Sequence, residues 1–332
     1  MQQPDPIDWI LEQDEENPGV RLFALTDLLD RQTDDPEVVA ARRSVMTTGP
    51  VPLILDAQFP EGFWVKPGGG YSPKYRSTVW QIIFLGKLGA DPADERVRRG
   101  CEYLLSHSIA SNGAFSARQQ PVPSGAIPCL NGNLLFALRR LGYAADPRAQ
   151  AALDWLARAV TGEGGFEYLK SSTAGPCFAC SANGRQPCAW GGNKAMRALL
   201  AVPAAERTPN IERAIEVGAA FLLSRDPAVA DYPYTKRVSS TWFKLGFPLT
   251  YWSDVLETTA VLVEAGYGQD PRLKNAFEFI LSKRDDQGRW PLENTINGKM
   301  WADIEEKRKP SKWITLRALR VLKGAGLYKP AG

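Results

Sequence analysis

The chain has 332 residues, with 40 Lys and Arg against 37 Asp and Glu and a net charge of +3. This balance, without a basic block, predicts neither a nucleic-acid nor a membrane-surface partner, and no apolar stretch reaches the length of a transmembrane span, about 18 residues. The N-terminal segment MQQPDPIDWILEQDEENPG is acidic and lacks an apolar run, so we expect no signal peptide, a cytoplasmic location, and five cysteines that are reduced or bind metal.

A helical unit of about 50 residues recurs along the chain. Each copy has a helix that begins at or near Asp-Pro or a related capping sequence, then a turn and Gly-x-Phe/Trp or a near variant. Asp caps the first turn of a helix, and Pro is tolerated there because its missing N–H has no helical partner. The copies are 28–64, 88–116, 141–168, 202–233 and 265–293.

A second, more apolar helix is predicted between these copies, after a leading helix near 7–13. Residues such as those of TVWQIIFLGKLG are apolar around most of the helix, which predicts that these helices lie inside. Their ranges are 20–31, 78–89, 131–142, 193–202, 255–266 and 312–326.

Alternating outer and inner helices predict an all-α fold in which helical hairpins stack on one another. About six hairpins suffice to close a ring, so we expect an (α/α)6 toroid that forms a single domain over 1–332, with a Cys-rich loop at 161–192. The alternative is an open solenoid of HEAT type.

Three segments resemble the glutamine–tryptophan repeats of squalene–hopene cyclases and related terpenoid cyclases. They are LILDAQFPEGFW (53–64), ILSKRDDQGRW (280–290) and, more weakly, LLSHSIASNGAF (104–115). The protein prenyltransferase β-subunits share the toroid. The resemblance runs over roughly 20–326 at the level of the repeat, and it implies the fold more strongly than the activity.

The chain departs from these families at their catalytic motifs. It has no Asp-x-Asp-Asp motif, with which class II cyclases protonate their substrate, and no Asp-Asp-x-x-Asp motif. The zinc ligands of protein prenyltransferases, an Asp, a Cys and a His, also have no counterpart. The nearest echo of the acidic motif is Asp254 with Glu257, one helical turn apart and therefore on one helix face.

Asp254 is the best candidate for a general acid, because burial among tryptophans would raise the pKa of a carboxyl group. The alternative is that Asp254 caps the helix that starts at Val255. Asp303 is a further candidate catalytic carboxylate, with Glu305 beside it, and both can instead pair with nearby Lys and Arg.

Aromatic residues gather where the inner helices begin, at what would be one mouth of the ring. As a group they predict a pocket for an apolar or cationic ligand, whereas each one alone can simply pack a helix end. The candidate substrate-binding residues are Tyr71, Tyr75, Trp80, Trp190, Tyr251, Trp252, Trp301 and Trp313.

Cys177, Cys180 and Cys188 have the spacing C-x2-C-x7-C, and Cys129 precedes the neighbouring inner helix. Four thiols meeting at one mouth would form a closed structural zinc site, in which His107 could replace one thiol. Ordinary buried thiols and a catalytic thiol or open metal site are the alternatives. Cys101 lies at an apolar spacing within a helix and is expected in the core.

The leading functional hypothesis is a terpenoid-cyclase-like enzyme that cyclises or isomerises an isoprenoid or other apolar small molecule in a central aromatic cavity by acid initiation. The second is a toroid that binds a hydrophobic ligand, or serves as a scaffold, without catalysis. The third is a glycan-processing enzyme, for which Asp254 and Asp303 would have to face each other across the cavity.

Overall fold

The computed structural model describes residues 5–164, 166, 177–234 and 238–330, and this part of the chain is helical, with isolated β-bridges but no strand. The prediction of an all-α fold is confirmed. None of the described helices is both long enough and apolar enough to cross a bilayer.

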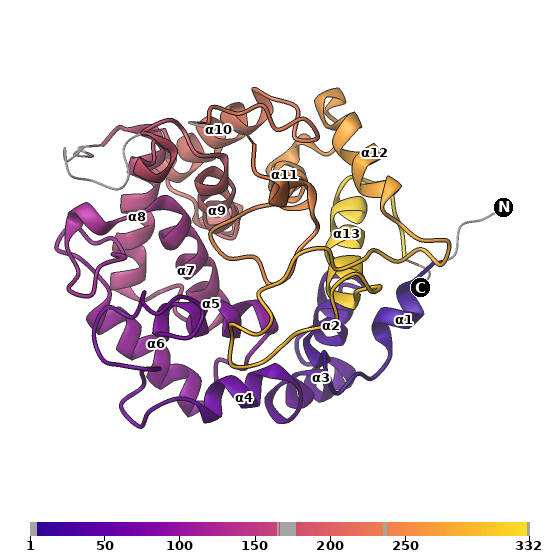
Figure 1. The fold of residues 1–332 in the computed structure, drawn as a ribbon, viewed down its shortest axis with the longest axis horizontal. Helices are drawn as coiled ribbons and strands as arrows, with labels where there is room; N and C mark the ends of the chain where they lie inside the picture. The colour runs from indigo at the N-terminus through magenta and orange to yellow at the C-terminus, as the bar shows by residue number, and fades with distance from the viewer. Residues whose placement is uncertain (1–4, 165, 167–176, 235–237, 331–332) are drawn as a thin grey trace.

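The inner helices follow one another around a ring (Figure 1). They are α2 (Pro18–Phe23) with the π-helical turn η1 (Ala24–Leu28), α5 (Thr78–Leu88), α7 (Pro128–Arg140), α9 (Ala189–Leu200), α11 (Val255–Leu262) with the π-helical turn η6 (Val263–Tyr267), and α13 (Lys312–Gly324). Each contacts the next along the chain, and the α-carbon of Gly19 in α2 faces the Leu88 carbonyl of α5. These helices match the inner helices predicted from the sequence to within a few residues.

The outer helices lie at the periphery of Figure 1 and bury one face each against the inner ring. They are α1 (Ile7–Leu11), α3 (Pro36–Thr47), α4 (Pro50–Asp56), α6 (Glu95–His107), α8 (Pro147–Thr161), α10 (Pro209–Leu223) and α12 (Lys274–Ser282). Short 3-10 turns complete the connections: η2 (Pro123–Gly125), η3 (Ser181–Asn183), η4 (Ala204–Glu206), η5 (Ser240–Phe243) and η7 (Pro271–Leu273).

The last helix closes the ring by contacting α1, α2 and η1. At this seam the indole Nε1 of Trp313 donates to Asn17 Oδ1 at 3.0 Å, and Lys323 pairs with Asp30. An open solenoid has no such contact between its ends, so the contacts of this chain are those of a closed ring.

Capping residues start most of the outer helices. Asp35, Asp146 and Asp270 each precede a proline and accept a hydrogen bond from a backbone N–H of the first turn. The second copy of the repeat differs from the expectation, because α6 is capped by Asp94 rather than by Asp91 of the Asp-Pro pair.

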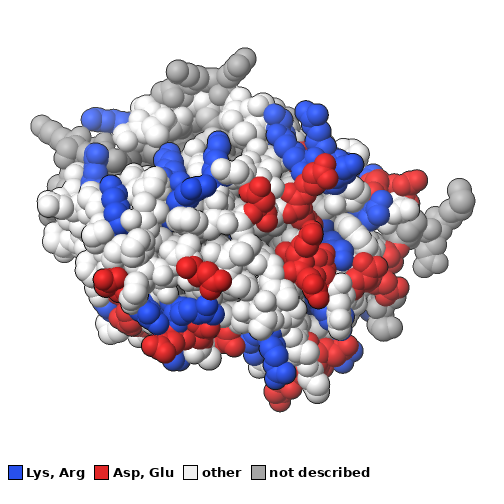
Figure 2. Space-filling model, turned by 60° about the horizontal axis from the view of Figure 1, so that its bottom comes forward, with Lys and Arg blue, Asp and Glu red and all other residues white. Residues whose placement is uncertain are grey.

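The charged side chains of both signs are interspersed on the face shown in Figure 2, where several carboxylates also gather. A small net charge is therefore compatible with local groups of like charge, and one such group lies inside the ring.

Candidate functional site

The segment 246–252 crosses the interior of the ring (Figure 1, orange). The Leu249 carbonyl accepts a hydrogen bond from Lys87 Nζ of α5 at 2.5 Å, and the Thr250 carbonyl accepts from Asn133 Nδ2 of α7 at 2.8 Å. The segment thereby forms a floor across the ring that is hydrogen-bonded to α5 and α7.

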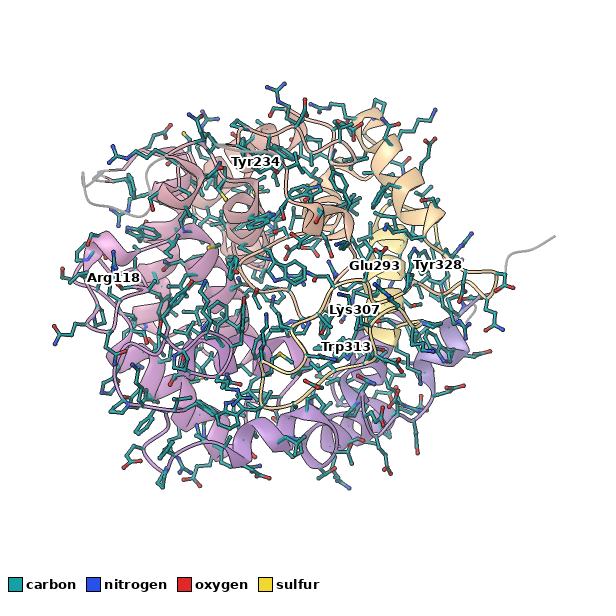
Figure 3. The ribbon with its side chains drawn as sticks, in the orientation of Figure 1. Arg118, Tyr234, Glu293, Lys307, Trp313 and Tyr328 are labelled. Carbon is teal, nitrogen blue, oxygen red and sulfur yellow. The ribbon has the colours of Figure 1, made fainter. Side chains whose placement is uncertain are left out.

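A central cavity of about 220 Å³ lies between this floor and the ends at which the inner helices finish, and it continues inward into a smaller space of about 40 Å³. Phe136, Phe247 and Trp313, the last labelled in Figure 3, supply the aromatic part of its wall. Phe247 stacks on Trp313 with ring centroids 4.2 Å apart. Trp313 is thus the one predicted aromatic that lines this cavity.

Positive charge dominates the cavity. The cations that line it, or that contact its lining carboxylates, come from four inner helices: Lys87, Arg140, Lys194, Arg197, Arg317 and Arg320. The matching carboxylates are Asp27, Asp254, Glu257 and Glu264. Even without Lys87, five cations face four carboxylates, which leaves an excess of positive charge in a partly desolvated space, where charge interactions are stronger than in water.

The arginines of the cavity are unequally paired. The Asp27 carboxylate forms ion pairs with both Arg320 and, at 3.8 Å, Arg140. Burial, reinforced by the neighbouring Arg320, lowers the pKa of Arg140 to about 10. Among the described residues Arg197 makes no ion pair, and its guanidinium lies 4.4 Å from the ring centroid of Phe136.

Lys87 lines the inner part of the same cavity. Burial lowers its pKa well below the usual value, and the charges of Lys194, Arg197 and Arg317 lower it further, against the opposing effect of Glu257. No described carboxylate forms an ion pair with this amine. Its hydrogen bond goes to the neutral Leu249 carbonyl.

Asp254 is completely buried and caps α11, where its carboxylate accepts from the Glu257 N–H at 2.8 Å. Both of its oxygens also accept from Arg317, at 2.8 and 3.0 Å. The capping alternative is therefore confirmed. This environment, with a guanidinium against the carboxylate, differs from the apolar one expected for a proton donor.

Glu257 forms a buried ion pair with Lys194 of the neighbouring helix α9. Burial alone would raise the pKa of this carboxyl group, but Lys194, Lys87 and Arg197 outweigh burial and bring the pKa down to about 2. Glu257 is therefore a carboxylate at neutral pH and has no proton to donate there.

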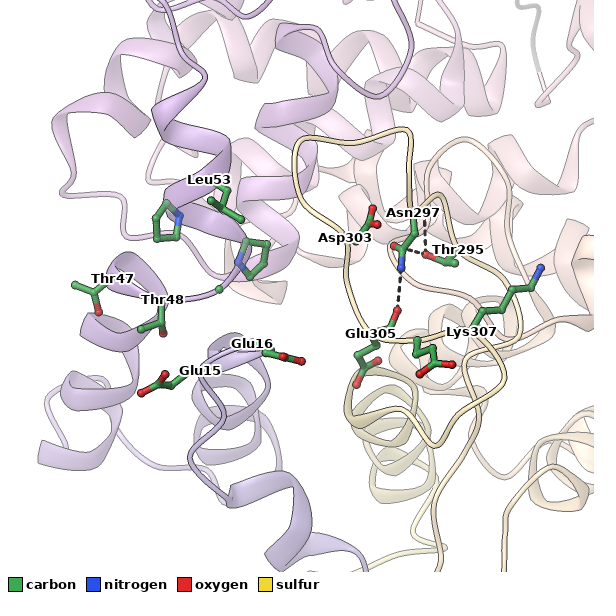
Figure 4. Close-up of a pocket in the computed structure, with 14 residues that line it drawn as sticks. Glu15, Glu16, Thr47, Thr48, Leu53, Thr295, Asn297, Asp303, Glu305 and Lys307 are labelled. Atoms are coloured by element: carbon green, nitrogen blue, oxygen red, sulfur yellow. Dashed lines mark hydrogen bonds between the residues drawn. The ribbon is translucent and has the colours of Figure 1, made fainter.

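Asp303 lies on the outside, in a surface cleft of about 1110 Å³ between the α2–α4 side of the ring and the loop 295–307 (Figure 4). It accepts from the Gly298 N–H at 2.6 Å. Glu305 lines the same cleft, and burial raises its pKa to about 7. The structure thus does not place Asp303 opposite the buried Asp254, the arrangement on which the glycan-processing hypothesis depends.

Five of the predicted aromatic residues form one cluster, apart from Trp313 in the wall of the cavity. Tyr71 and Tyr75 pack against Trp80, and Tyr251 bridges Trp80 and Trp190, all with ring centroids 5.1 to 6.4 Å apart. These five rings pack against one another where the inner helices begin, as in the helix-end alternative.

The remaining two predicted aromatics lie apart from this cluster. Trp252 is buried against Gly246, whereas Trp301 is on the surface, where its Nε1 donates to the Arg76 carbonyl at 2.9 Å. Neither of them faces the central cavity.

Only some of the cysteines lie close together. A hydrogen bond from the Cys188 thiol lowers the pKa of Cys180 to about 6, and the pKa of Cys188 rises well above its usual value. Burial, with the nearby Cys180, raises the pKa of Cys129 to about 12. Cys177 is exposed, and Cys101 is buried in α6 as expected.

Among the described residues no three His, Cys, Asp or Glu side chains are placed to hold a metal ion. His107 stacks on Tyr103 in α6, with ring centroids 4.0 Å apart. The Cys-rich loop 161–192 lies partly outside the described residues. Zinc stays a prediction, and metal analysis of the purified protein tests it.

The cations of the cavity were missed in reading the sequence. The signal for them was present, because basic residues recur near the end of the inner helices, in GKLG (86–89), LRRLG (138–142), MRALL (196–200) and LRALRVLKG (316–324). Cations near a helix C-terminus are usual, since they complement the helix dipole. Only ring closure brings them together in one cavity.

No family model matches the chain, and no curated protein matches it. Among solved structures, a protein from Actinoplanes matches with a TM-score of 0.44 and 16% identity, covering 96% of this chain and 90% of that one.

The type II terpene cyclase MstE from Scytonema matches with a TM-score of 0.43 and 15% identity, covering 87% of this chain and 84% of that one. Its R337A variant, in complex with the substrate geranylgeranyl dihydroxybenzoate, matches with a TM-score of 0.42 and 16% identity, over 82% and 70% of the two chains. All three TM-scores are below 0.5, and it is the contacts between the helices of this chain that show the ring.

Proposed function

We propose that the protein binds a small molecule with an anionic group in the central cavity of the ring. The observation that carries the proposal is the excess of cations there, and in particular the absence of an ion pair for Arg197 among the described residues. A guanidinium presents paired N–H donors to a phosphate or carboxylate, and such charge-assisted hydrogen bonds are stronger than neutral ones.

An isoprenoid ligand, suggested by the sequence, fits this proposal if it carries an anionic head. Leu256, Val263 and Val321 line the cavity beside the arginines and offer an apolar surface to a short hydrocarbon part. A volume of about 220 Å³ is below the range of about 300–1,000 Å³ typical of sites for drug-sized ligands. The cavity therefore suits a small molecule, and a long isoprenoid chain would have to extend past the mouth.

Acid-initiated cyclisation or isomerisation remains the alternative function. It requires a protonated acid facing the ligand, whereas Asp254 and Glu257 are both ion-paired to cations. Binding without this chemistry is the function that the geometry supports better.

Isothermal titration calorimetry with geranyl phosphate, geraniol, inorganic phosphate and succinate tests the proposal. We expect the phosphorylated alcohol to bind and the uncharged alcohol of equal length not to bind. The substitution Arg197→Gln should weaken anion binding by about tenfold or more, the value of a charge-assisted hydrogen bond.

Arg213→Gln is the matched control, because this arginine lies on the outer helix α10 and is 54% exposed. It should leave binding unchanged. Equal affinity for geraniol and geranyl phosphate would favour the purely apolar cavity of the sequence hypothesis. Failure of all three anions to bind at millimolar concentration would contradict the proposal.

A further inference from the structure

Lys87 is a half-buried amine on the wall of the central cavity with an unusual set of neighbours. The charged groups that face it come from α7, α9, α11 and α13: Arg140, Lys194, Arg197, Glu257, Arg317 and Arg320. The one carboxylate among them, Glu257, is already paired with Lys194. The surroundings of the Lys87 amine therefore repel a positive charge.

Such surroundings favour the neutral form of the lysine amine. Burial removes water from the ammonium form, and nearby cations oppose it further, so the pKa of Lys87 falls well below its usual value. A neutral amine keeps a lone pair and is a nucleophile, which is the way lysines in apolar or cationic surroundings are activated in enzymes. The hydrogen bond to the Leu249 carbonyl does not prevent this, because a neutral amine still has N–H groups to donate.

The arginines beside Lys87 restrict the substrate that would reach it. Arg140, Arg197 and Arg320 line both the outer and the inner parts of the cavity, so an anion held by them lies next to the space that Lys87 lines. A small molecule with an anionic group at one end would then present its other end to the amine.

We propose that Lys87 forms an imine with a small aldehyde or ketone whose carboxylate or phosphate is held by Arg140, Arg197 and Arg320. This inference rests on the proposed anion site and goes beyond it, because it assigns a covalent step to the cavity. The step is ordinary lysine chemistry, because lysine amines in enzymes condense with carbonyl substrates to form imines.

The step balances without a cofactor. The Lys87 nitrogen attacks the carbonyl carbon, and a proton moves from nitrogen to the carbonyl oxygen to give a carbinolamine. A further proton, taken from solvent, allows this oxygen to leave as water and produces a protonated imine. The cationic imine withdraws electrons from the neighbouring carbon atoms of the substrate.

Reductive trapping on the wild-type protein tests this proposal. Glyoxylate, a small aldehyde with a carboxylate, is added with sodium cyanoborohydride at neutral pH, and peptide mapping locates the carboxymethyl groups formed on lysines. We expect Lys87 to be labelled about tenfold or more faster than Lys274, whose side chain is 76% exposed and which serves as the reference for an ordinary lysine. Propanal, which lacks the carboxylate, should label Lys87 much more slowly than glyoxylate does.

The variants Lys87→Arg and Lys274→Arg form a matched pair. Lys87→Arg keeps the positive charge and a donor for the Leu249 carbonyl, but a guanidinium does not form the imine. It should abolish the fast phase of labelling, which Lys274→Arg should leave unchanged. If Lys87→Arg is poorly folded, peptide mapping of the wild-type protein still compares the labelling rates of Lys87 and Lys274 and so tests the proposal.

The outcomes separate this inference from the proposed function. Anion binding in the calorimeter combined with labelling of Lys87 no faster than Lys274 would overturn the imine proposal and leave the anion site standing. Fast labelling of Lys87 by glyoxylate and propanal alike would show a reactive amine that does not depend on a bound anion. That result would overturn the imine proposal as stated, whereas calorimetry alone decides the anion site.

Discussion

The carboxylate of Asp254 and the guanidinium of Arg317 form a two-pronged ion pair between α11 and α13, with N–O distances of 2.8 and 3.0 Å. The same carboxylate caps α11, and the same guanidinium donates to the Gly246 carbonyl at 2.6 Å. One buried pair thus joins two inner helices to the segment that forms the floor of the cavity.

Replacing Asp254 by Asn should destabilise the protein by about 3–5 kcal/mol, because the change leaves Arg317 without its counter-charge in a partly buried site. Chemical denaturation measures this. Asp303→Asn is the control, since Asp303 is exposed in the outer cleft, and it should cost less than about 1 kcal/mol. A stable Asp254→Asn protein that has lost a measurable turnover would instead support the general-acid hypothesis.

Acid should destabilise the fold partly through Glu257. The pKa of this carboxyl group in the folded protein, about 2, is below its usual value of 4.5. A lowered pKa contributes stability above pH 4.5, and this contribution is lost as the pH falls from 4.5 toward 2. Urea unfolding across this range should show a steeper loss for the wild type than for Glu257→Gln, which has no carboxyl group to titrate. Parallel curves for the two proteins would contradict the role given to Glu257.

Gly132 should not tolerate a methyl group, because α7 and α9 touch there. A Cβ atom on Gly132 would lie 2.2 Å from the Lys194 carbonyl oxygen, so Gly132→Ala should cost about 1–3 kcal/mol of stability. Gly191→Ala is the matched helical control. The nearest atom to its Cβ would be 3.6 Å away, so we expect stability that is unchanged or higher by up to about 1 kcal/mol. Equal thermal unfolding of both variants would show that the helices can move apart without loss.

The Cys180 thiol should titrate near pH 6, since the Cys188 thiol donates a hydrogen bond to its thiolate. Cys188→Ser, whose hydroxyl can still donate, should change this pKa less than Cys188→Ala, which should raise it toward the usual value. The pH dependence of alkylation at Cys180, followed by mass spectrometry, measures the shift. An unchanged pKa in Cys188→Ala would remove Cys188 as the cause.

The positions of the helices could be predicted from the sequence because their signals are local. Apolar residues around the whole of 78–89 and a capping Asp146 before Pro147 act within one helix, and the structure has helices at these places. Where two Asp residues compete, as with Asp91 and Asp94, the pattern alone does not decide which one caps the helix.

The site was harder to predict because its chemistry depends on contacts between distant parts of the chain. Asp254 was expected among tryptophans, but the ring places Arg317, 63 residues later, against it. In the sequence, Arg197 and Lys87 are single basic residues near helix ends, where cations are usual, so nothing local distinguishes them. Their importance arises from the closure of the ring, which gathers cations that solvent would otherwise keep apart.

The seam between α13 and the N-terminal helices joins residues near the two ends of the chain. Lys323 reaches Asp30, and the Tyr328 hydroxyl donates to Asp5 at 2.9 Å. A mechanical load applied to the two termini would therefore act first on these two contacts. Their loss would open the cavity before the other hairpins separate. In a force-extension experiment the earliest event should be short in length and should coincide with loss of anion binding.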